Sequence, residues 1–354
     1  MKFLGLAAHF SRRDRLRQLF TIGKKSDYVA LEKYLTHRYS GQRTILTKNG
    51  RSALTLALQS YFEPGDKIIV NGFTCYAVYE AVKAAGLEPV FADIDKTTLN
   101  FNSLPNADGI IVQNSLGNTI DIKPIENSGL IIIEDLAHCA GRHYPDGREV
   151  GTVGAATAFS FGKDKSIDTV SGGAVVLRKN PKNYVKNPSK HPKLSDHLRA
   201  RFYPTFGAMT RALAHIHLGG PLMRALVKIH FVEKSADSKL SLERKPSKFQ
   251  AKLALAQFKN LRGNSKNLRE FYLVNNRDEV LQKLKRAGYH FAGFWYEKPV
   301  SPERYYKKVH FPEKSCPNAT FVAAHIINFP NYYTDDELKP AYEIIKPYLV
   351  EESK

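Results

Sequence analysis

Short apolar runs, rich in β-branched residues, alternate with amphipathic stretches along the first half of the chain. The runs are continuous rather than broken by a polar residue at every second position, which is typical of strands buried on both faces. Seven runs are predicted to form strands: 44–47, 67–71, 89–93, 109–113, 130–135, 156–161 and 173–178. Helical patterns lie beside or between them, at 26–40, 51–62 and 75–86. We therefore expect an α/β fold with a largely parallel sheet covered by helices.

The pattern changes after residue 180, where strand-like runs become rare. Residues 194–231 predict two helices around Gly219-Gly220-Pro221, and residues 245–288 predict one long amphipathic helix. A C-terminal helix is expected to begin after Thr334, whose side chain suits an N-cap. The predicted organisation is an N-terminal arm (1–25), a large domain (26–180), a basic helical insertion (181–240) and a smaller C-terminal α+β domain (241–354).

Positive charge is concentrated in one quarter of the chain. Residues 181–270 hold 19 Lys and Arg against 5 Asp and Glu, in a chain with a formal net charge of +19. Such a field favours anionic partners, but it does not choose among phosphorylated ligands, acidic lipid and nucleic acid. Nucleic acid is not expected as a partner, because no binding motif and few aromatic residues accompany the charges.

The cysteines and the apolar runs bear on the cellular compartment. Cys75, Cys139 and Cys316 follow no metal-binding or disulfide spacing, which fits a reducing compartment and no structural metal. No apolar run approaches the roughly 20 residues of a membrane-spanning helix. The apolar patch near the N-terminus is too short for a signal peptide. We therefore expect a cytoplasmic protein.

Two segments at predicted strand ends carry candidate chemistry. In LTKNGRSALTLAL (46–58), a strand ends and a helix begins near Gly50, and the free N–H groups of a helix N-terminus bind phosphate well. In IIIEDLAHCAG (131–141), Asp135 would point from a strand end into the crevice where parallel sheets bind ligands. Its carboxylate suits a cationic ligand or a helix N-cap, and the segment alone does not decide between these two roles.

A third segment, SFGKDKSIDTVSGG (160–173), places Lys163 and Lys165 after a buried strand. Desolvation there would lower the pKa of a lysine and make its amine nucleophilic, whereas the simpler interpretation is a surface turn with solvated lysines. A phosphate cradle, an acid and such a lysine are together what a pyridoxal 5′-phosphate enzyme requires. They anchor the cofactor, keep its ring nitrogen protonated and form the Schiff base.

The same three segments resemble motifs of the DegT/DnrJ/EryC1/StrS family of sugar aminotransferases. Residues 49–54 are similar to the family's SGTAAL, residues 134–139 to EDAAHA, and residues 160–173 to SFHPTKNLTTGEGG without a gap. The resemblance runs from about residue 26 to 348, apart from an extra segment near 185–240. It implies fold type I, the aspartate aminotransferase-like architecture, with a mostly parallel seven-stranded sheet and a smaller C-terminal α+β domain.

The resemblance also implies roles for individual residues. The Schiff-base lysine of the family follows its Ser-Phe pair by four residues, which selects Lys165 and not Lys163 for the internal aldimine. The implied cofactor-binding residues are Gly50, Arg51, Cys75, Asp135, His138, Ser160 and Lys165. Three of the matches depart from the family. Cys75 stands where an aromatic ring usually stacks on the cofactor, Arg51 replaces a threonine, and the segment 242–245, which contains Glu243, replaces an asparagine of the neighbouring subunit.

The implied activity is that of an aminotransferase in polysaccharide biosynthesis. It would convert a nucleotide-linked keto sugar to an amino sugar with glutamate as the amino donor, working as a homodimer, and Lys165 would shuttle the proton. Relatives with histidine at the lysine position act as dehydratases, and Lys165 argues against that branch. The alternative is a non-catalytic regulatory or binding protein that keeps the fold. Intact Lys165, Asp135 and Ser160 disfavour this alternative.

The extra segment has two interpretations. Residues 195–232 interleave apolar residues with arginines and a lysine, and such a basic amphipathic hairpin can lie on an anionic membrane surface. Alternatively, its apolar face packs on the protein's own domain or on the dimer mate. Deletion would leave a folded protein in the first case and would destabilise the fold or the dimer in the second.

Overall fold

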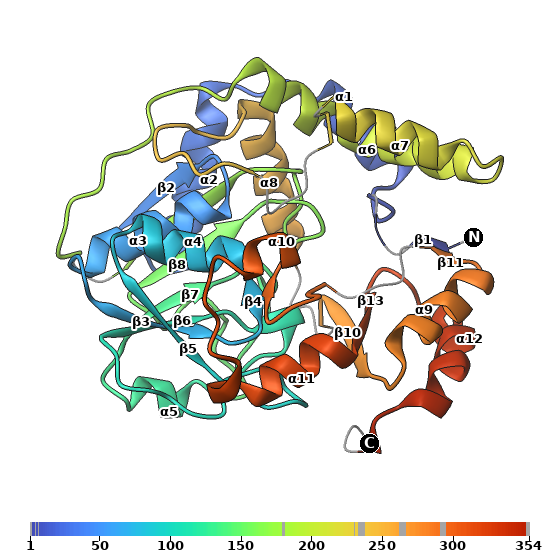
Figure 1. Ribbon diagram of the computed structural model, residues 1–354. Coiled ribbons are helices and arrows are strands. Elements are labelled where there is room, and N and C mark those ends of the chain that lie inside the picture. The colour runs from blue at the N-terminus through green and yellow to red at the C-terminus, as the bar shows by residue number, and fades with distance from the viewer. Residues whose placement is uncertain are drawn as a thin grey trace.

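The computed structural model describes residues 2–3, 5, 7–178, 181–229, 231–232, 238–261, 267–290 and 295–351. Its centre is a seven-stranded sheet (Figure 1). The strands are, in spatial order, β2 (Arg43–Thr47), β9 (Gly173–Leu177), β8 (Ala156–Ser160), β7 (Ile131–Asp135), β6 (Gly109–Val112), β3 (Lys67–Asn71) and β5 (Glu88–Ala92). β9 runs antiparallel to β2 and β8, and the other pairs are parallel. All seven predicted strands are thus confirmed.

Helices cover both faces of this sheet because each strand sends apolar side chains to both sides. In β3, Ile69 packs in the cluster that contains α2 (Lys25–Arg38) and α8 (Lys248–Asn260). Ile68 and Val70 point to the opposite cluster, which contains α3 (Gly50–Tyr61) and α4 (Tyr76–Ala84). This burial on both faces explains why the runs show no polar alternation.

A buried carboxylate in the central strand β7 holds the segment that leads into β8. Glu134, in β7, is fully buried and accepts hydrogen bonds from Tyr144 (2.6 Å), Gly151 N (2.7 Å), Val153 N (3.0 Å) and Gly154 N (2.7 Å). It also forms an ion pair of 2.8 Å with Arg178. A buried charge is tolerated only when its oxygens are satisfied in this way.

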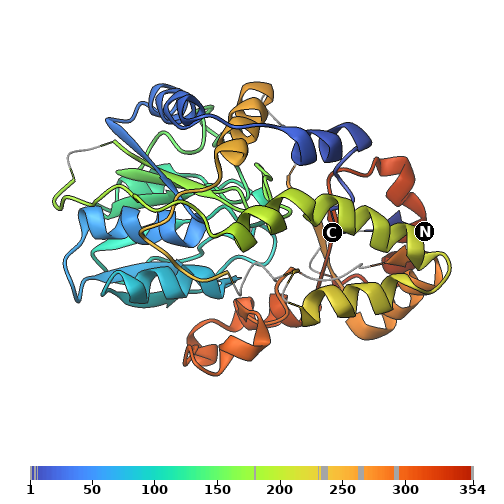
Figure 2. The same cartoon turned by 90° about the horizontal axis from the view of Figure 1, so that it is seen from above.

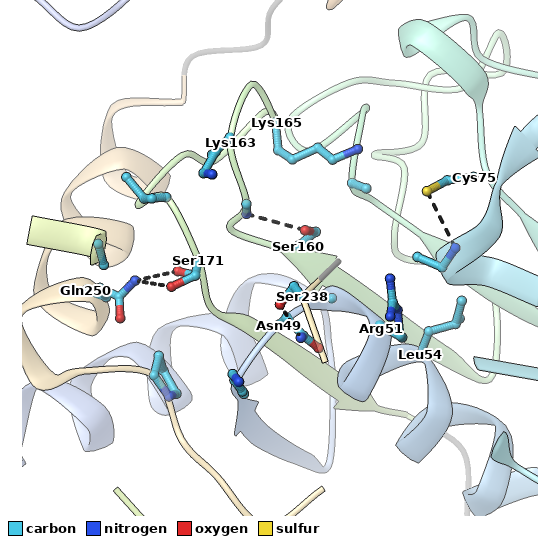
Figure 3. Close-up of a pocket in the computed structure, with 18 of the residues that line it drawn as sticks. Asn49, Arg51, Leu54, Cys75, Ser160, Lys163, Lys165, Ser171, Ser238 and Gln250 are labelled. Atoms are coloured by element: carbon cyan, nitrogen blue, oxygen red, sulfur yellow. Dashed lines mark hydrogen bonds between the residues drawn. The ribbon is translucent and has the colours of Figure 1, made fainter. Parts of the chain in front are cut away.

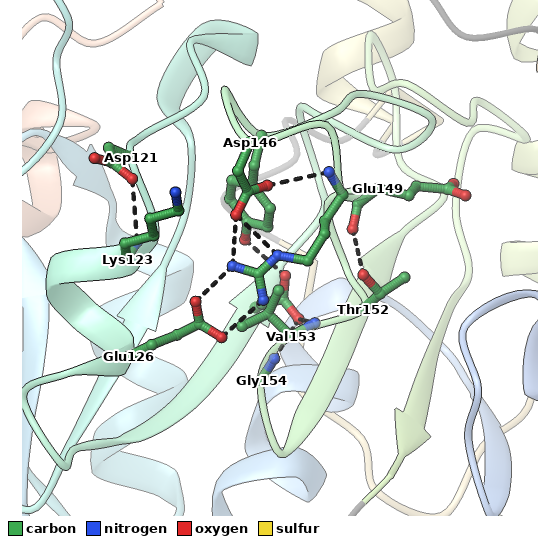
Figure 4. A network of polar contacts seen from close by, with 11 residues as sticks. Asp121, Lys123, Glu126, Asp146, Glu149, Thr152, Val153 and Gly154 are labelled. Carbon is green, nitrogen blue, oxygen red and sulfur yellow. Dashed lines mark hydrogen bonds and ion pairs between the residues drawn. The ribbon is translucent and has the colours of Figure 1, made fainter.

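An exposed ion-pair cluster lies beside that network. Arg148 donates to Asp146 (2.9 Å) and to Glu126 (2.8 Å). Figure 4 shows Asp146 and Glu126 on either side of this contact, with Val153 and Gly154 close by. Glu126 ends the short helix α5 (Lys123–Glu126), so the cluster ties that helix to the loop after β7. Exposed pairs of this kind contribute little to stability.

The prediction of one long helix over 245–288 is wrong. The structure instead has α8, then the strand β10 (Arg269–Leu273), then α9 (Arg277–Arg286), while residues 262–266 lie outside the described part. β10 pairs antiparallel with β13 (Ile326–Pro330), more than 50 residues away in sequence. This long-range pairing overrides a local pattern that suits either a helix or a strand.

The remaining elements are short, and most of them lie in the C-terminal part of the chain, which ends with α12 (Asp335–Ile345). The capping box of α12 confirms the predicted cap, since Thr334 accepts from Glu337 N and Glu337 bonds back to Thr334 N. The further elements are β1 (Lys2–Phe3), β4 (Thr74–Cys75), β11 (Tyr289–His290), β12 (Val300–Ser301), α10 (Glu303–Tyr306), α11 (Pro317–His325) and α12 (Asp335–Ile345). β1 pairs with β11, and β4 pairs with β12.

The predicted hairpin forms as two helices, α6 (Leu194–Ala214) and α7 (Gly219–Lys228). α6 lies between α7 and α1 (Arg12–Phe20), as Figure 2 shows from above. The base of α6 is core, because Ala200 and Tyr203 are buried in a cluster with Phe249. α7 approaches the outer half of α6 closely, and a Cβ on Gly219 would lie 2.3 Å from the Thr210 carbonyl oxygen. Among the described residues, no helix has the length and apolarity needed to cross a bilayer.

Candidate active site

The carboxyl ends of the parallel strands form the floor of a pocket (Figure 3). β7 ends at Asp135 and β8 ends at Ser160, and both residues face this pocket. All of the residues predicted to bind the cofactor line it: Gly50, Arg51, Cys75, Asp135, His138, Ser160 and Lys165. They come from four separate segments of the chain, so only the folded sheet brings them together.

One wall of the pocket is the N-terminus of α3. Asn49 caps this helix by accepting from Ser52 N (2.9 Å). The first turn of the helix lines the pocket. A Cβ on Gly50 would lie 2.5 Å from the Ser160 Cβ, so only glycine allows the helix to approach β8 this closely. The first turn of a helix presents N–H groups without intrahelical partners and a partial positive charge. Beside the Ser160 hydroxyl, it is suited to a phosphate group.

The two neighbouring acids of β7 point in opposite directions and have different environments. Glu134 faces the buried network described above, whereas Asp135 is half-buried and faces the pocket. Asp135 Oδ1 accepts from Ala137 N (3.0 Å). Burial raises the pKa of Asp135, while this hydrogen bond and the charge of Lys165 oppose the shift. A cationic ring nitrogen in the pocket would further favour the charged carboxylate.

Lys165 lies in the loop between β8 and β9, with its amine inside the molecule. Burial lowers the pKa of Lys165, and the charges of Cys75, Asp135 and Asp164 only partly oppose this effect. Its Nζ lies 4.6 Å from the centre of the Trp295 ring and 2.8 Å from His138 Nε2. An uncharged amine is the nucleophilic form of lysine, and the lowered pKa favours this form.

The hydrogen bonds of His138 indicate the protonation state of Lys165. Leu116 N donates to His138 Nδ1 (3.1 Å), so this nitrogen must carry a lone pair. Burial is the largest cause that lowers the pKa of His138 well below its usual value, so the ring is neutral and its proton is on Nε2. Nε2–H then donates to Lys165 Nζ, and only an uncharged amine can accept. The geometry and the lowered lysine pKa therefore agree.

The stacking role expected for Cys75 stays a prediction, although the residue does line the pocket. Its Sγ accepts from Ala77 N at 3.5 Å and so begins α4. Ala137 lines the same pocket. Two small side chains would leave room for a flat ring, and sulfur packs well against aromatic faces.

The other two departures from the family motif are placed as follows. Arg51 lines the pocket and is buried, and it forms an ion pair with the half-buried Glu80, which lies on α4. Glu243 is exposed and pairs with Lys190 (2.6 Å), so its charge is directed away from the site. Lys245, two residues further along the chain, lines the pocket instead.

Several pocket residues escaped the sequence interpretation. Tyr203 and Arg199 come from the base of α6, which shows that the extra segment forms part of the site wall. Lys163 also lines the pocket, and its Nζ lies 4.3 Å from the centre of the Tyr203 ring. Gln250, on α8, donates to the Ser171 carbonyl (2.8 Å), as Figure 3 shows. This contact fixes the loop between β8 and β9 that contains Lys165, called the lysine loop below, on α8. Gln250 lies inside the range over which the sequence resembles the family, whereas Tyr203 lies in the extra segment, where no motif marked it.

Residues 15–186 match the model of the DegT/DnrJ/EryC1/StrS aminotransferase family. A pleiotropic regulatory protein of Geobacillus stearothermophilus is 32% identical over 141 residues, which cover 36% of this chain and 38% of that protein. A GDP-perosamine synthase of Caulobacter vibrioides is 31% identical over 159 residues, which cover 42% of this chain and 43% of that protein. The chain thus matches less than half the length of these two curated relatives.

The likeness in fold extends over nearly the whole chain. A DegT DnrJ EryC1 StrS aminotransferase from Brucella abortus superposes with a TM-score of 0.67 and 19% sequence identity, covering 98% of this chain and 99% of that one. At this identity the likeness shows the fold, that of the fold type I transferases. The segment 15–186, just under half of the chain, is similar to the DegT/DnrJ/EryC1/StrS aminotransferase family, and it holds every predicted site residue.

Proposed function

We propose that this protein is a pyridoxal 5′-phosphate-dependent aminotransferase that converts a nucleotide-linked keto sugar to an amino sugar, with glutamate as the amino donor. The observation that carries the proposal is the pocket in which the uncharged amine of Lys165, the carboxylate of Asp135 and the N-terminus of α3 converge. These three groups come from separate segments, and each meets one requirement of the cofactor.

The residues present fit the cofactor. The space between Gly50 and Ser160, called the phosphate cradle below, is too narrow for a Cβ at position 50. Backbone N–H groups of the helix and the Ser160 hydroxyl are therefore the groups available there to a phosphate. Asp135 lines the pocket, and its Oδ1 is oriented by the hydrogen bond that it accepts from Ala137 N. Bound pyridoxal phosphate would supply an electron sink for the charge that develops on the substrate carbon.

Each residue then has a defined task. Lys165 would attach the cofactor through Nζ and, once released by the incoming amine, accept the proton from the substrate carbon. Its lowered pKa favours the uncharged form, which is the form able to accept a proton. His138 would orient Nζ through Nε2 (2.8 Å), and Asp135 would hold a proton on the ring nitrogen.

Two sets of cations support the two substrates. The main pocket is lined by Lys48, Lys163, Arg199 and Lys245, which suit the diphosphate of a nucleotide sugar. A second pocket next to Lys165 is lined by Arg142 and Arg269, whose guanidinium groups suit the carboxylates of an amino acid.

We propose a cytoplasmic homodimer as the working form. The family resemblance supports the dimer. The free cysteines Cys75, Cys139 and Cys316 support a reducing compartment. The second candidate function is that of a regulatory or binding protein, favoured by the name of the Geobacillus relative. The pocket with its prepared lysine argues against a purely structural use of the fold.

The test is a substrate screen with the purified, cofactor-loaded protein. Nucleotide-linked 3-keto and 4-keto sugars are offered with glutamate, and the amino sugar is detected by its mass together with 2-oxoglutarate. The protein should be yellow as isolated and should lose its aldehyde absorbance when glutamate is added alone. A colourless protein that binds no added cofactor would instead favour the regulatory function.

A further inference from the structure

An outer layer of helices carries most of the exposed apolar side chains. The name helical layer is used here for residues 12–25, which contain α1, and residues 194–229, which contain α6 and α7. Figure 2 shows these three helices side by side on one side of the molecule. Of the thirteen large hydrophobic side chains exposed in the described part of the chain, ten belong to this layer: Leu16, Phe20, Ile22, Leu194, Leu198, Met209, Ile216, Leu218, Val227 and Ile229.

Apolar side chains are strongly exposed at the outer end of the hairpin and at the end of α1. Ile216 and Leu218, in the turn between α6 and α7, are 61% and 54% exposed, and Ile229 after α7 is 68% exposed. Phe20 and Ile22 are 72% and 77% exposed. Single exposed apolar residues need no explanation, but a concentration of them on one layer marks a surface that contacts something apolar.

The charge of the layer is strongly positive. It holds 11 Lys and Arg and 2 acidic residues, Asp14 and Asp196. Both acids are engaged inside the layer or with the large domain, since Asp14 caps α1 through Ser11 and Asp196 pairs with Lys48 (3.2 Å). Exposed cations flank the apolar residues on α1 and α7: Arg12, Arg13, Arg17, Arg224 and Lys228.

We propose that the helical layer docks on an anionic membrane surface. Apolar side chains beside exposed cations are what an interfacial amphipathic helix uses, with the apolar groups inserted and the cations near lipid phosphates. A second copy of the chain fits this surface less well, because a two-fold contact would place the same positive layer against itself. The docking is peripheral, since no described helix can cross a bilayer.

The position of the layer connects this surface to the pocket. The base of α6 lines the pocket with Arg199 and Tyr203, while Ile216 lies in the turn at the other end of α6 and Ile229 directly follows α7. A docked protein would therefore hold the pocket close to lipid headgroups. The docking itself does not depend on the proposed reaction, so each can fail alone.

The experiment is sedimentation of the full-length, cofactor-loaded protein with vesicles at low salt. Vesicles of phosphatidylglycerol mixed with phosphatidylcholine should carry the protein into the pellet, and vesicles of phosphatidylcholine alone should not. The triple variant Ile216→Ser, Leu218→Ser, Ile229→Ser should lower partitioning roughly tenfold or more. The triple variant Arg12→Gln, Arg224→Gln, Lys228→Gln should lower it by a similar factor and reduce its dependence on salt.

Matched controls change exposed residues outside the layer. Two control variants should sediment like the unmodified protein. The apolar control combines Val29→Ser, Tyr184→Ser and Tyr342→Ser, and the basic control combines Lys182→Gln, Lys186→Gln and Lys339→Gln. The proposal is overturned if the unmodified protein stays in the supernatant with anionic vesicles. It is also overturned if the apolar triple variant sediments normally. Loss of dimer mass in that variant, without vesicle binding by the parent, would assign the surface to a second copy instead.

Discussion

At the residue scale, adjacent positions in one strand perform unrelated tasks. Glu134 and Asp135 are both carboxylates at the end of β7, yet the pleat sends them to opposite faces of the sheet. Glu134 is saturated by backbone N–H groups, a tyrosine and Arg178, whereas Asp135 accepts from Ala137 and faces the pocket. Chemistry at this site thus depends on which face a side chain occupies as much as on its type.

The first residue-scale prediction concerns the two lysines. Lys165→Ala should abolish covalent trapping of pyridoxal phosphate by borohydride, because the variant lacks the buried uncharged amine. Lys163→Ala is the control and should still trap the cofactor. The trapped protein is identified by mass after proteolysis. Trapping that survives in the Lys165→Ala protein would exclude this lysine.

The second residue-scale prediction concerns Asp135. Asp135→Asn keeps the size of the side chain and the acceptor for Ala137 N but removes the negative charge. The variant should bind cofactor nearly as well, while turnover falls by about a hundredfold or more, because the ring nitrogen loses its charged partner. Cofactor absorbance and single-turnover rates measure the two effects separately. Near-normal turnover would show that Asp135 does not hold the proton.

At the element scale, the phosphate binding proposed for the N-terminus of α3 depends on the close approach of its first turn to β8. Gly50→Ala would place a methyl group about 2.5 Å from the Ser160 Cβ, where no flexible side-chain end can move aside. We expect a loss of about 1–3 kcal/mol in unfolding free energy and weaker phosphate binding. Gly220→Ala is the control, since its nearest neighbour is the mobile end of Arg224 at 3.5 Å. Denaturant unfolding measures the free energy, and titration measures cofactor affinity. Equal losses of both quantities in the two variants would contradict the assignment of a phosphate site to Gly50 and Ser160.

A second element-scale prediction concerns the N-terminal arm, which is held to the lysine loop by His9. His9 lies 3.1 Å from Asp168 and 3.6 Å from Asp164. Burial and Arg211 lower the pKa of His9, but the hydrogen bond and charge of Asp168 outweigh them, so its pKa is raised above 6.5. Stabilisation of the arm is therefore fully present below the unfolded value and is lost as the pH rises through the folded-state pKa.

The arm should accordingly become easier to cut by trypsin at the arginines of α1 as the pH rises from about 6 to 9. In His9→Gln, which keeps a hydrogen-bond donor but cannot be charged, cleavage should be faster at low pH and nearly independent of pH. Tryptic rates are corrected with an unstructured peptide at each pH. An unchanged pH profile in the variant would rule out His9 as the titrating group.

At the scale of the whole molecule, the hairpin belongs to two environments. Its base packs with Phe249 and lines the pocket, and its outer half projects with exposed apolar side chains. Deletion of 195–232 should therefore destabilise the fold. Replacement of only 208–228 by a short Gly-Ser linker should leave the thermal midpoint within a few degrees of the parent. Scanning calorimetry tests both, and equal destabilisation would show that the outer half is core as well.

The sequence by itself determined the seven strands and the lysine segment, because both depend on local patterns. A continuous β-branched run is buried wherever it folds, and the spacing from Ser160 to Lys165 is fixed along the chain. The same locality explains the error over 245–288, since REFYL becomes the strand β10 only by pairing with β13.

Only the tertiary structure decided the surroundings of the site. The face occupied by Asp135, the ion pair of Arg51 with Glu80 and the tautomer of His138 all depend on segments distant in sequence. The split role of the hairpin is of the same kind, because burial of Tyr203 and exposure of Ile216 follow from what packs against each turn of the helices. Contacts between distant segments leave no local pattern, so the fold alone reveals them.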